Sequence, residues 1–389
     1  MNKVKIFFLL VFCYLFIGLT ITNFSFADSK KNEELKEYYE EQMKRPDYVT
    51  VKAKVIDIPF DDTMVDKPDV PLISDIRYQH LKVKILTGKH KGEIYTVRNT
   101  IEMISPYKLI IEKNNSILLN LTEDDQGKVV NLRVYERSRE NNLYFIIGLF
   151  IFLLILIGGL KGLKSALTLI FTASMIIFVL LPLILKGLNP IIISVLVCII
   201  TVAVTLVVIS GRNKKTLTAF LGTMGGVLIA GLLALAVGSA SNLTGLGNED
   251  AQLLAYIPQN SQIDFRGLLF AGIIIGALGA VMDVTMSVAS AMREIEDVHP
   301  KIETKDLIRS GMNIGKDIMG SMSNTLILAY AGGSIHLMLL FMAFNMAPLE
   351  IINLDLIASE IVRAMAGSIG LICAIPLTAF IGATIGREY

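Results

Sequence analysis

The sequence has few of the residues that form metal sites and disulfide frameworks. It contains three cysteines and four histidines among 389 residues, and Cys13, Cys198 and Cys373 all lie in apolar stretches. The HExxH, GxSxG and Walker A motifs are absent. These absences argue against a disulfide-stabilised domain, a metalloprotease, a serine hydrolase and an ATPase. We therefore expect no metal, no cofactor and no enzymatic activity.

Charged residues are also scarce, at 18% of the chain, whereas a soluble globular protein has about 25%. Of the 71 charged residues, 41 lie between Asp28 and Asn142, where 20 basic and 21 acidic residues nearly cancel. This balance gives no indication of nucleic-acid binding. Because the 247 residues after Asn142 are mostly apolar, the sequence predicts a polar domain followed by a large membrane domain.

The N-terminal segment has the pattern of a secretory signal. Lys3 and Lys5 precede an apolar run over residues 6–21, and the small residues Ser25 and Ala27 follow it. This pattern predicts a signal peptide over residues 1–27, with cleavage after Ala27. An uncleaved N-terminal anchor helix is the alternative. Both interpretations place residues 28–142 outside the cytoplasm.

The polar segment 28–142 is predicted to form a small β-rich domain. A charged stretch with helical composition opens it, over residues 28–45. Alternation of apolar and polar residues then predicts about five strands. The alternating segments are 49–55, 81–85, 94–97, 109–111 and 130–134. A turn at Gly88–Gly92 separates two of them, and the spacing favours an oligonucleotide/oligosaccharide-binding (OB) type of barrel.

Apolar runs recur from Leu143 onward, and each is close to the roughly 20 residues that a helix needs to cross a bilayer. They predict an α-helical integral membrane bundle of about seven spans over residues 143–389, surrounded by lipid. The predicted spans are 143–160, 165–185, 191–210, 216–240, 267–292, 317–343 and 359–385.

Basic residues between the spans predict the orientation of this bundle. Placing residues 28–142 outside sends 11 Lys or Arg residues to the cytoplasmic side, including those of the 293–316 loop. The outward connections hold only Lys186 and Arg266. This asymmetry follows the positive-inside rule, so we expect a cytoplasmic C-terminus.

Small residues in the fourth and fifth spans indicate close helix packing. The positions concerned are Gly225, Gly226, Gly272, Gly276 and Gly279. In a transporter, these glycine-rich helices would provide a sliding surface.

Asp283 is the most conspicuous residue of the membrane domain, because an uncompensated carboxylate within a bilayer costs several kcal/mol. At helical spacing it shares a small, polar face with Gly276, Gly279 and Ser287, and this face is predicted to point into the bundle. Asp317 and Asn324 provide a matching surface in the sixth span.

Glu360 and Arg363 lie three residues apart in the seventh span, so they can pair on one helix face. Together with Asp283, Ser287, Asp317 and Asn324, they define a candidate ion or substrate pathway through the last three spans. The alternative is a buried network of hydrogen bonds that fixes how the helices align.

Several of these segments resemble the YibE/F-like family of bacterial membrane proteins. They are Gly267–Gly272 (GLLFAG), Gly276–Val284 (GALGAVMDV), Ser310–Gly320 (SGMNIGKDIMG) and Asn324–Tyr330 (NTLILAY). The resemblance covers most of the membrane domain and implies a multi-pass protein of the bacterial cell membrane with an exported N-terminal domain. It implies no substrate and no mechanism.

Two functions from different classes follow from these observations. The first is secondary transport of a small solute or ion, coupled to proton or cation movement at Asp283. The alternative is a receptor or envelope assembly factor that does not transport and that binds an envelope protein through residues 28–142.

Overall fold

The computed structural model describes residues 48–65, 75–255 and 263–385. The predicted signal or anchor segment and the charged stretch 28–45 lie outside these ranges. The chain forms two compact units, with the boundary between Leu153 and Leu154. Each unit is described by itself below.

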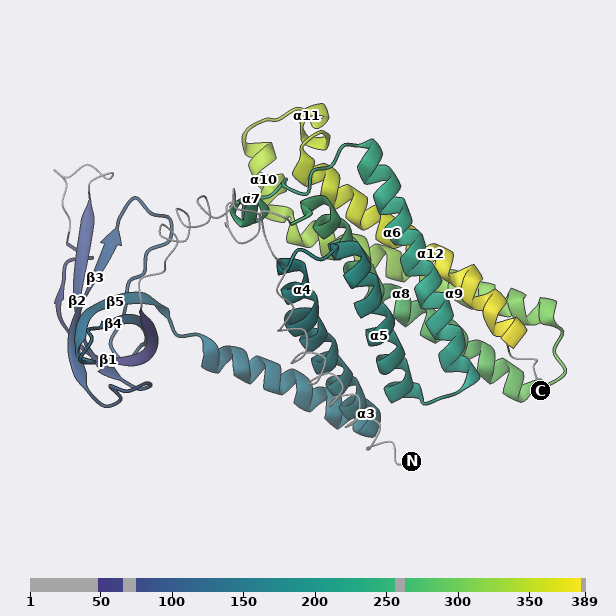
Figure 1. Ribbon diagram of the computed structural model, residues 1–389, viewed down its shortest axis with the longest axis horizontal. Coiled ribbons are helices and arrows are strands. Elements are labelled where there is room, and N and C mark those ends of the chain that lie inside the picture. Colours follow the sequence, from purple (N-terminus) through teal and green to yellow (C-terminus); the bar gives the residue numbers. More distant parts are fainter. Residues whose placement is uncertain (1–47, 66–74, 256–262, 386–389) are drawn as a thin grey trace, which may run out of the picture. The chain divides into compact units, whose positions relative to one another are not determined.

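Five antiparallel strands form the N-terminal unit (Figure 1). They are β1 (Val49–Asp61), β2 (Ile76–Ile85), β3 (Ile94–Glu102), β4 (Ser116–Glu123) and β5 (Val129–Arg137). Their order in the sheet is β3-β2-β1-β4-β5, and β3 also contacts β5. The sheet therefore curls into a near-barrel, which confirms the predicted β-rich domain and is compatible with an OB-type barrel.

The period-two pattern determines the core of this near-barrel. Val51, Ala53 and Val55 of β1 are buried, while the residues between them are more exposed. Val55 is opposite Val83 in β2, and Ala53 is opposite Ile117 in β4. Alternating apolar side chains from neighbouring strands thus fill one face of the sheet.

One predicted strand is wrong, and the fourth observed strand was not predicted. Residues 109–111 form no strand; side chains bind their backbone instead. The buried Gln79 side chain accepts from the Ile111 N–H at 2.9 Å and donates to the Ile111 carbonyl at 3.0 Å. Asn99 donates to the Leu109 carbonyl at 2.8 Å. These bonds satisfy an extended loop without a neighbouring strand.

A buried ion pair lies at the start of β2. The Arg77 guanidinium donates to both carboxylate oxygens of Asp75, at 2.5 and 2.7 Å. Arg77 also donates to the backbone carbonyls of Asp62 and Val65. Arg77 is only 4% exposed and Asp75 only 7%. This bidentate geometry compensates two charges that burial would otherwise penalise.

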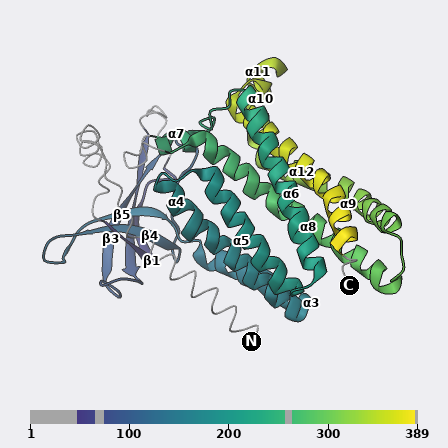
Figure 2. The same cartoon turned by 45° about the vertical axis from the view of Figure 1, so that its right-hand side comes forward.

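The second unit is helical (Figures 1 and 2). A first group contains α3 (Glu140–Met175), the π-helical turn η2 (Ile176–Leu180), α4 (Leu181–Leu185), α5 (Pro190–Ser210), α6 (Lys214–Ala240) and α7 (Glu249–Ala255). A second group contains α8 (Phe265–Val298), α9 (Thr304–Gly333), α10 (Ile335–Ala343), α11 (Pro348–Ile352) and α12 (Asp355–Ile385).

Among the described residues, five helical segments are long and apolar enough to cross a membrane, and the bent pair α9–α10 makes a sixth. The protein is therefore a multi-pass membrane protein within a lipid bilayer. The first two predicted spans lie in the 46-residue helical segment Glu140–Leu185. Gly159, with a left-handed φ of 54°, divides this segment into two helices at a kink, near the end of the first predicted span.

Helix α6 packs against both α8 and α12. A Cβ atom added at Gly226 would lie 2.8 Å from the Gly370 carbonyl oxygen, and one added at Gly370 would lie 2.7 Å from the Gly226 carbonyl oxygen. The two backbones therefore touch directly. The absence of a side chain at both positions permits this approach.

Candidate functional site

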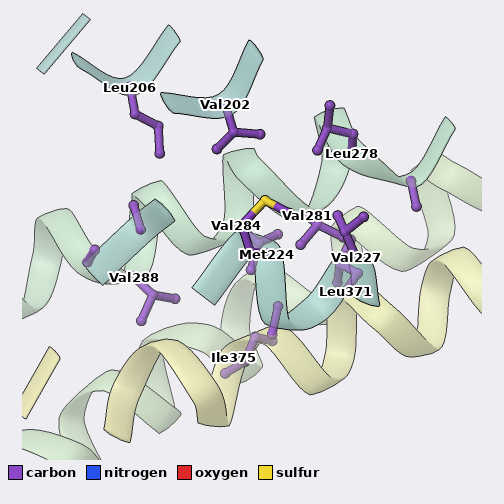
Figure 3. Packing of buried hydrophobic residues seen from close by; sticks show 14 of the residues in the cluster. Val202, Leu206, Met224, Val227, Leu278, Val281, Val284, Val288, Leu371 and Ile375 are labelled. Carbon is purple, nitrogen blue, oxygen red and sulfur yellow. The ribbon is translucent and has the colours of Figure 1, made fainter. Parts of the chain in front are cut away.

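Helix α8 has two different faces. Val281, Val284 and Val288 are fully buried against α5, α6 and α12, as Figure 3 shows. The opposite face, which carries Asp283 and Ser287, is exposed. The prediction that this small, polar face points into the bundle therefore does not hold within one chain, because the β-branched side chains occupy the inward direction.

Asp283 lies near the middle of this open face. Its carboxylate makes no hydrogen bond or ion pair with any residue that the structure describes. The Ser287 hydroxyl donates to the Asp283 backbone carbonyl at 2.8 Å, so this hydroxyl already has a hydrogen-bond acceptor within its own helix. Asp283 is thus a carboxylate in an apolar helix that needs water, an ion or another protein group nearby.

Helix α9 runs antiparallel to α8 and carries a second open, polar face. Met292 of α8 packs against Gly311 near the start of α9. Gly276 of α8 lies next to the Tyr330 hydroxyl near the end of α9. Between these two contacts lie Asp283 and Ser287 on α8, and Asp317 and Asn324 on α9; all four are exposed. These four predicted residues therefore lie in the same stretch of the antiparallel pair α8 and α9.

Arg363 and Glu360 form a second polar group, on α12. The Arg363 guanidinium donates to Glu360 Oε1 at 2.8 Å, so the predicted pair is present. Arg363 Nε is buried without a hydrogen-bond partner in the described chain, and so is the Ser359 hydroxyl one turn earlier. The two unused donors identify this end of α12 as a place where a further polar group would be stabilised.

Tyr330 connects the two groups. A Cβ atom added at Gly276 would lie 2.9 Å from the Tyr330 hydroxyl oxygen. This hydroxyl also lies close enough to Arg363 and Glu360 to interact with their charges. The sequence alone did not show this contact. Ser359 was missed, although its spacing of four residues from Arg363 places both on one helix face.

The predicted packing glycines differ in what surrounds them. A Cβ atom added at Gly225 would lie 2.7 Å from a Leu377 side-chain atom, and one at Gly226 would overlap α12. Gly276 lies against Tyr330, as described above. No atom lies within 4 Å of the corresponding positions at Gly272 and Gly279 in the described chain, so no helix of the chain approaches them closely.

The described residues contain no group of three or more His, Cys, Asp or Glu side chains that could hold a metal ion. The two polar groups instead offer a carboxylate, amides, hydroxyls and a guanidinium. Such groups bind protons, small ions and polar solutes.

Comparison with known proteins gives two matches to family models. Residues 146–388 match a model described as YibE/F-like protein, and residues 47–135 match one described as YibE/F family N-terminal domain. No curated protein and no solved structure matches the chain.

Proposed function

Because the chain belongs to the YibE/F-like family and spans the membrane several times, we propose that it is a secondary transporter. It moves a small solute or ion together with a proton or cation, and it is not an enzyme. The observation that carries this proposal is the unpaired carboxylate of Asp283 on an exposed face of an apolar, 34-residue helix. Ionisable groups within membrane helices usually belong to ion or solute pathways.

The break between α9 and α10 supports the same proposal. The two helices are bent by 56° at Ser334, one turn after Tyr330. Transporter binding sites are often formed where a membrane helix is discontinuous, because the break frees backbone groups for ligands. Tyr330, Arg363 and Glu360 lie close to this break, so solute would bind near them and the coupling ion at Asp283.

The orientation of this transporter follows from its loops. Residues 28–142 lie outside the cell and the C-terminus lies in the cytoplasm of a bacterium. We expect Lys301→Cys, between α8 and α9, to stay unlabelled by a membrane-impermeant maleimide in intact cells and to become labelled after permeabilisation. Lys89→Cys, on an exposed turn of the near-barrel, should be labelled in both states. Ready labelling of Lys301→Cys in intact cells would reverse the topology.

The coupling role of Asp283 is tested in proteoliposomes that contain a pH-sensitive dye and are exposed to a panel of metabolites and ions. We expect the wild-type protein to move protons when its solute is added. Asp283→Asn should reduce this signal to the level of empty vesicles, because an amide cannot release a proton. The variant should still fold, since the carboxylate makes no bond that folding needs.

Asp317→Asn is the matched control, because Asp317 is another exposed acid on the neighbouring helix. It should retain part of the signal. If Asp283→Asn behaves like the wild type, Asp283 is not the coupling site. If no member of the panel crosses the membrane with the wild-type protein, while the near-barrel captures an envelope protein, the receptor function replaces transport.

A further inference from the structure

A concave pocket lies at the ends of four helices, far along α8 and α12 from Asp283 and Arg363. It is open to solvent and is lined by residues of α6, α8, α9 and α12. Its floor contains the buried side chains of Ala289, Met292 and Leu307. The candidate pathway described above uses none of these residues.

Basic side chains dominate the rim of this pocket. Lys214, Lys215 and Arg293 line it, against a single acid, Glu296. Arg293 donates to Glu296 at 2.8 Å and is also paired with Asp297 at 2.8 Å. Lys215 makes no ion pair with any residue that the structure describes. Lys215 therefore provides a positive charge at the rim that no described acid neutralises.

A hydroxyl group lies beside these cations. Thr218 lines the pocket and is 4% exposed. Its hydroxyl makes no hydrogen bond within the described part of the chain, and its oxygen is not one of the fully buried atoms that lack a partner, so it is accessible to a ligand in the pocket. Helix α6, with 27 residues, begins at Lys214, so the positive end of its dipole also points here. The Thr218 hydroxyl, the Lys215 ammonium group and the N-terminus of α6 therefore lie at the same pocket.

We infer that this pocket binds a phosphate group. Phosphate oxygens accept from lysine and hydroxyl donors and are favoured at helix N-termini. The pocket lies where the apolar helices end in charged residues, which is the level of lipid headgroups. Its apolar floor suits the start of an acyl chain. An anionic phospholipid supplies both features, and free phosphate supplies the first.

Native mass spectrometry of the full-length protein tests this inference, with phosphatidylglycerol, phosphatidylcholine and inorganic phosphate as probes. We expect phosphatidylglycerol to bind more tightly than phosphatidylcholine. Lys215→Gln and Thr218→Val should each weaken phosphatidylglycerol binding by about tenfold, which corresponds to the loss of one charge-assisted hydrogen bond. Lys161→Gln, an exposed lysine in α3 outside the pocket, is the matched control and should bind like the wild type.

The inorganic phosphate arm identifies the source of the phosphate group. If millimolar phosphate displaces phosphatidylglycerol, the pocket recognises the phosphate alone; if it does not, the lipid is the ligand. Both outcomes support the inference. Wild-type binding by Lys215→Gln and Thr218→Val, or an equal loss in Lys161→Gln, would overturn it, because the lipid would then bind through surface charge in general.

Discussion

Replacing Gly226 by alanine is expected to destabilise the helical unit, whereas the same replacement at Gly272 should leave its stability unchanged or raise it. The Cβ atom of Gly226→Ala would lie 2.6 Å from Ala374 Cβ and 2.8 Å from the Gly370 carbonyl oxygen. Helix backbone cannot move as easily as the end of a side chain, so overpacking here should cost roughly 1–3 kcal/mol.

Gly272 is the matched control because nothing lies within 4 Å of its corresponding position. In open space, alanine stabilises a helix by up to about 1 kcal/mol relative to glycine. Thermal unfolding of the detergent-solubilised variants should therefore shift in opposite directions. Equal midpoints for the two variants would show that α6 and α12 do not touch at Gly226.

Replacing Asp75 by asparagine should open the near-barrel around β2. The substitution keeps the shape of the side chain but removes the carboxylate charge that pairs with the buried Arg77 guanidinium. Removing one member of a buried ion pair typically costs about 3–5 kcal/mol. Hydrogen exchange of the β2 and β3 amides in the full-length protein should become faster by the corresponding factor.

The double variant Asp75→Asn, Arg77→Met separates the ion pair from the packing around it. Because it removes both charges, it should lose less stability than Asp75→Asn alone. If the double variant exchanges faster than Asp75→Asn, the pair is not what stabilises this end of β2.

Local sequence patterns were sufficient to predict much of the fold. Alternation along Val51, Ala53 and Val55 predicted a strand with one buried face, and long apolar runs predicted most of the membrane helices. Strand β4 was missed because the adjacent residues Leu118 and Leu119 interrupt its alternation. The extended loop 109–111 depends on Gln79, about thirty residues away in sequence, and such long-range hydrogen bonds leave no local pattern.

The candidate site was predictable to a similar degree. The spacing of Glu360 and Arg363 predicted their ion pair because both partners lie on one helix. Asp283 was identified from the cost of a carboxylate in a membrane helix. Helical spacing shows which residues share a face but not which neighbouring helices cover it, and within one chain the face of Asp283 is left open.

The contact between Gly226 and Gly370 has a mechanical consequence for any transport cycle. Because two backbones meet there, no side chain can change its rotamer to let α6 slide along α12, and the methyl groups of Ala374 and Ala230 lie directly beside the two glycines. These two helices are therefore expected to keep their relative position. In the proposed transport cycle, the rearrangement between inward-open and outward-open states would take place at the bent pair α9–α10.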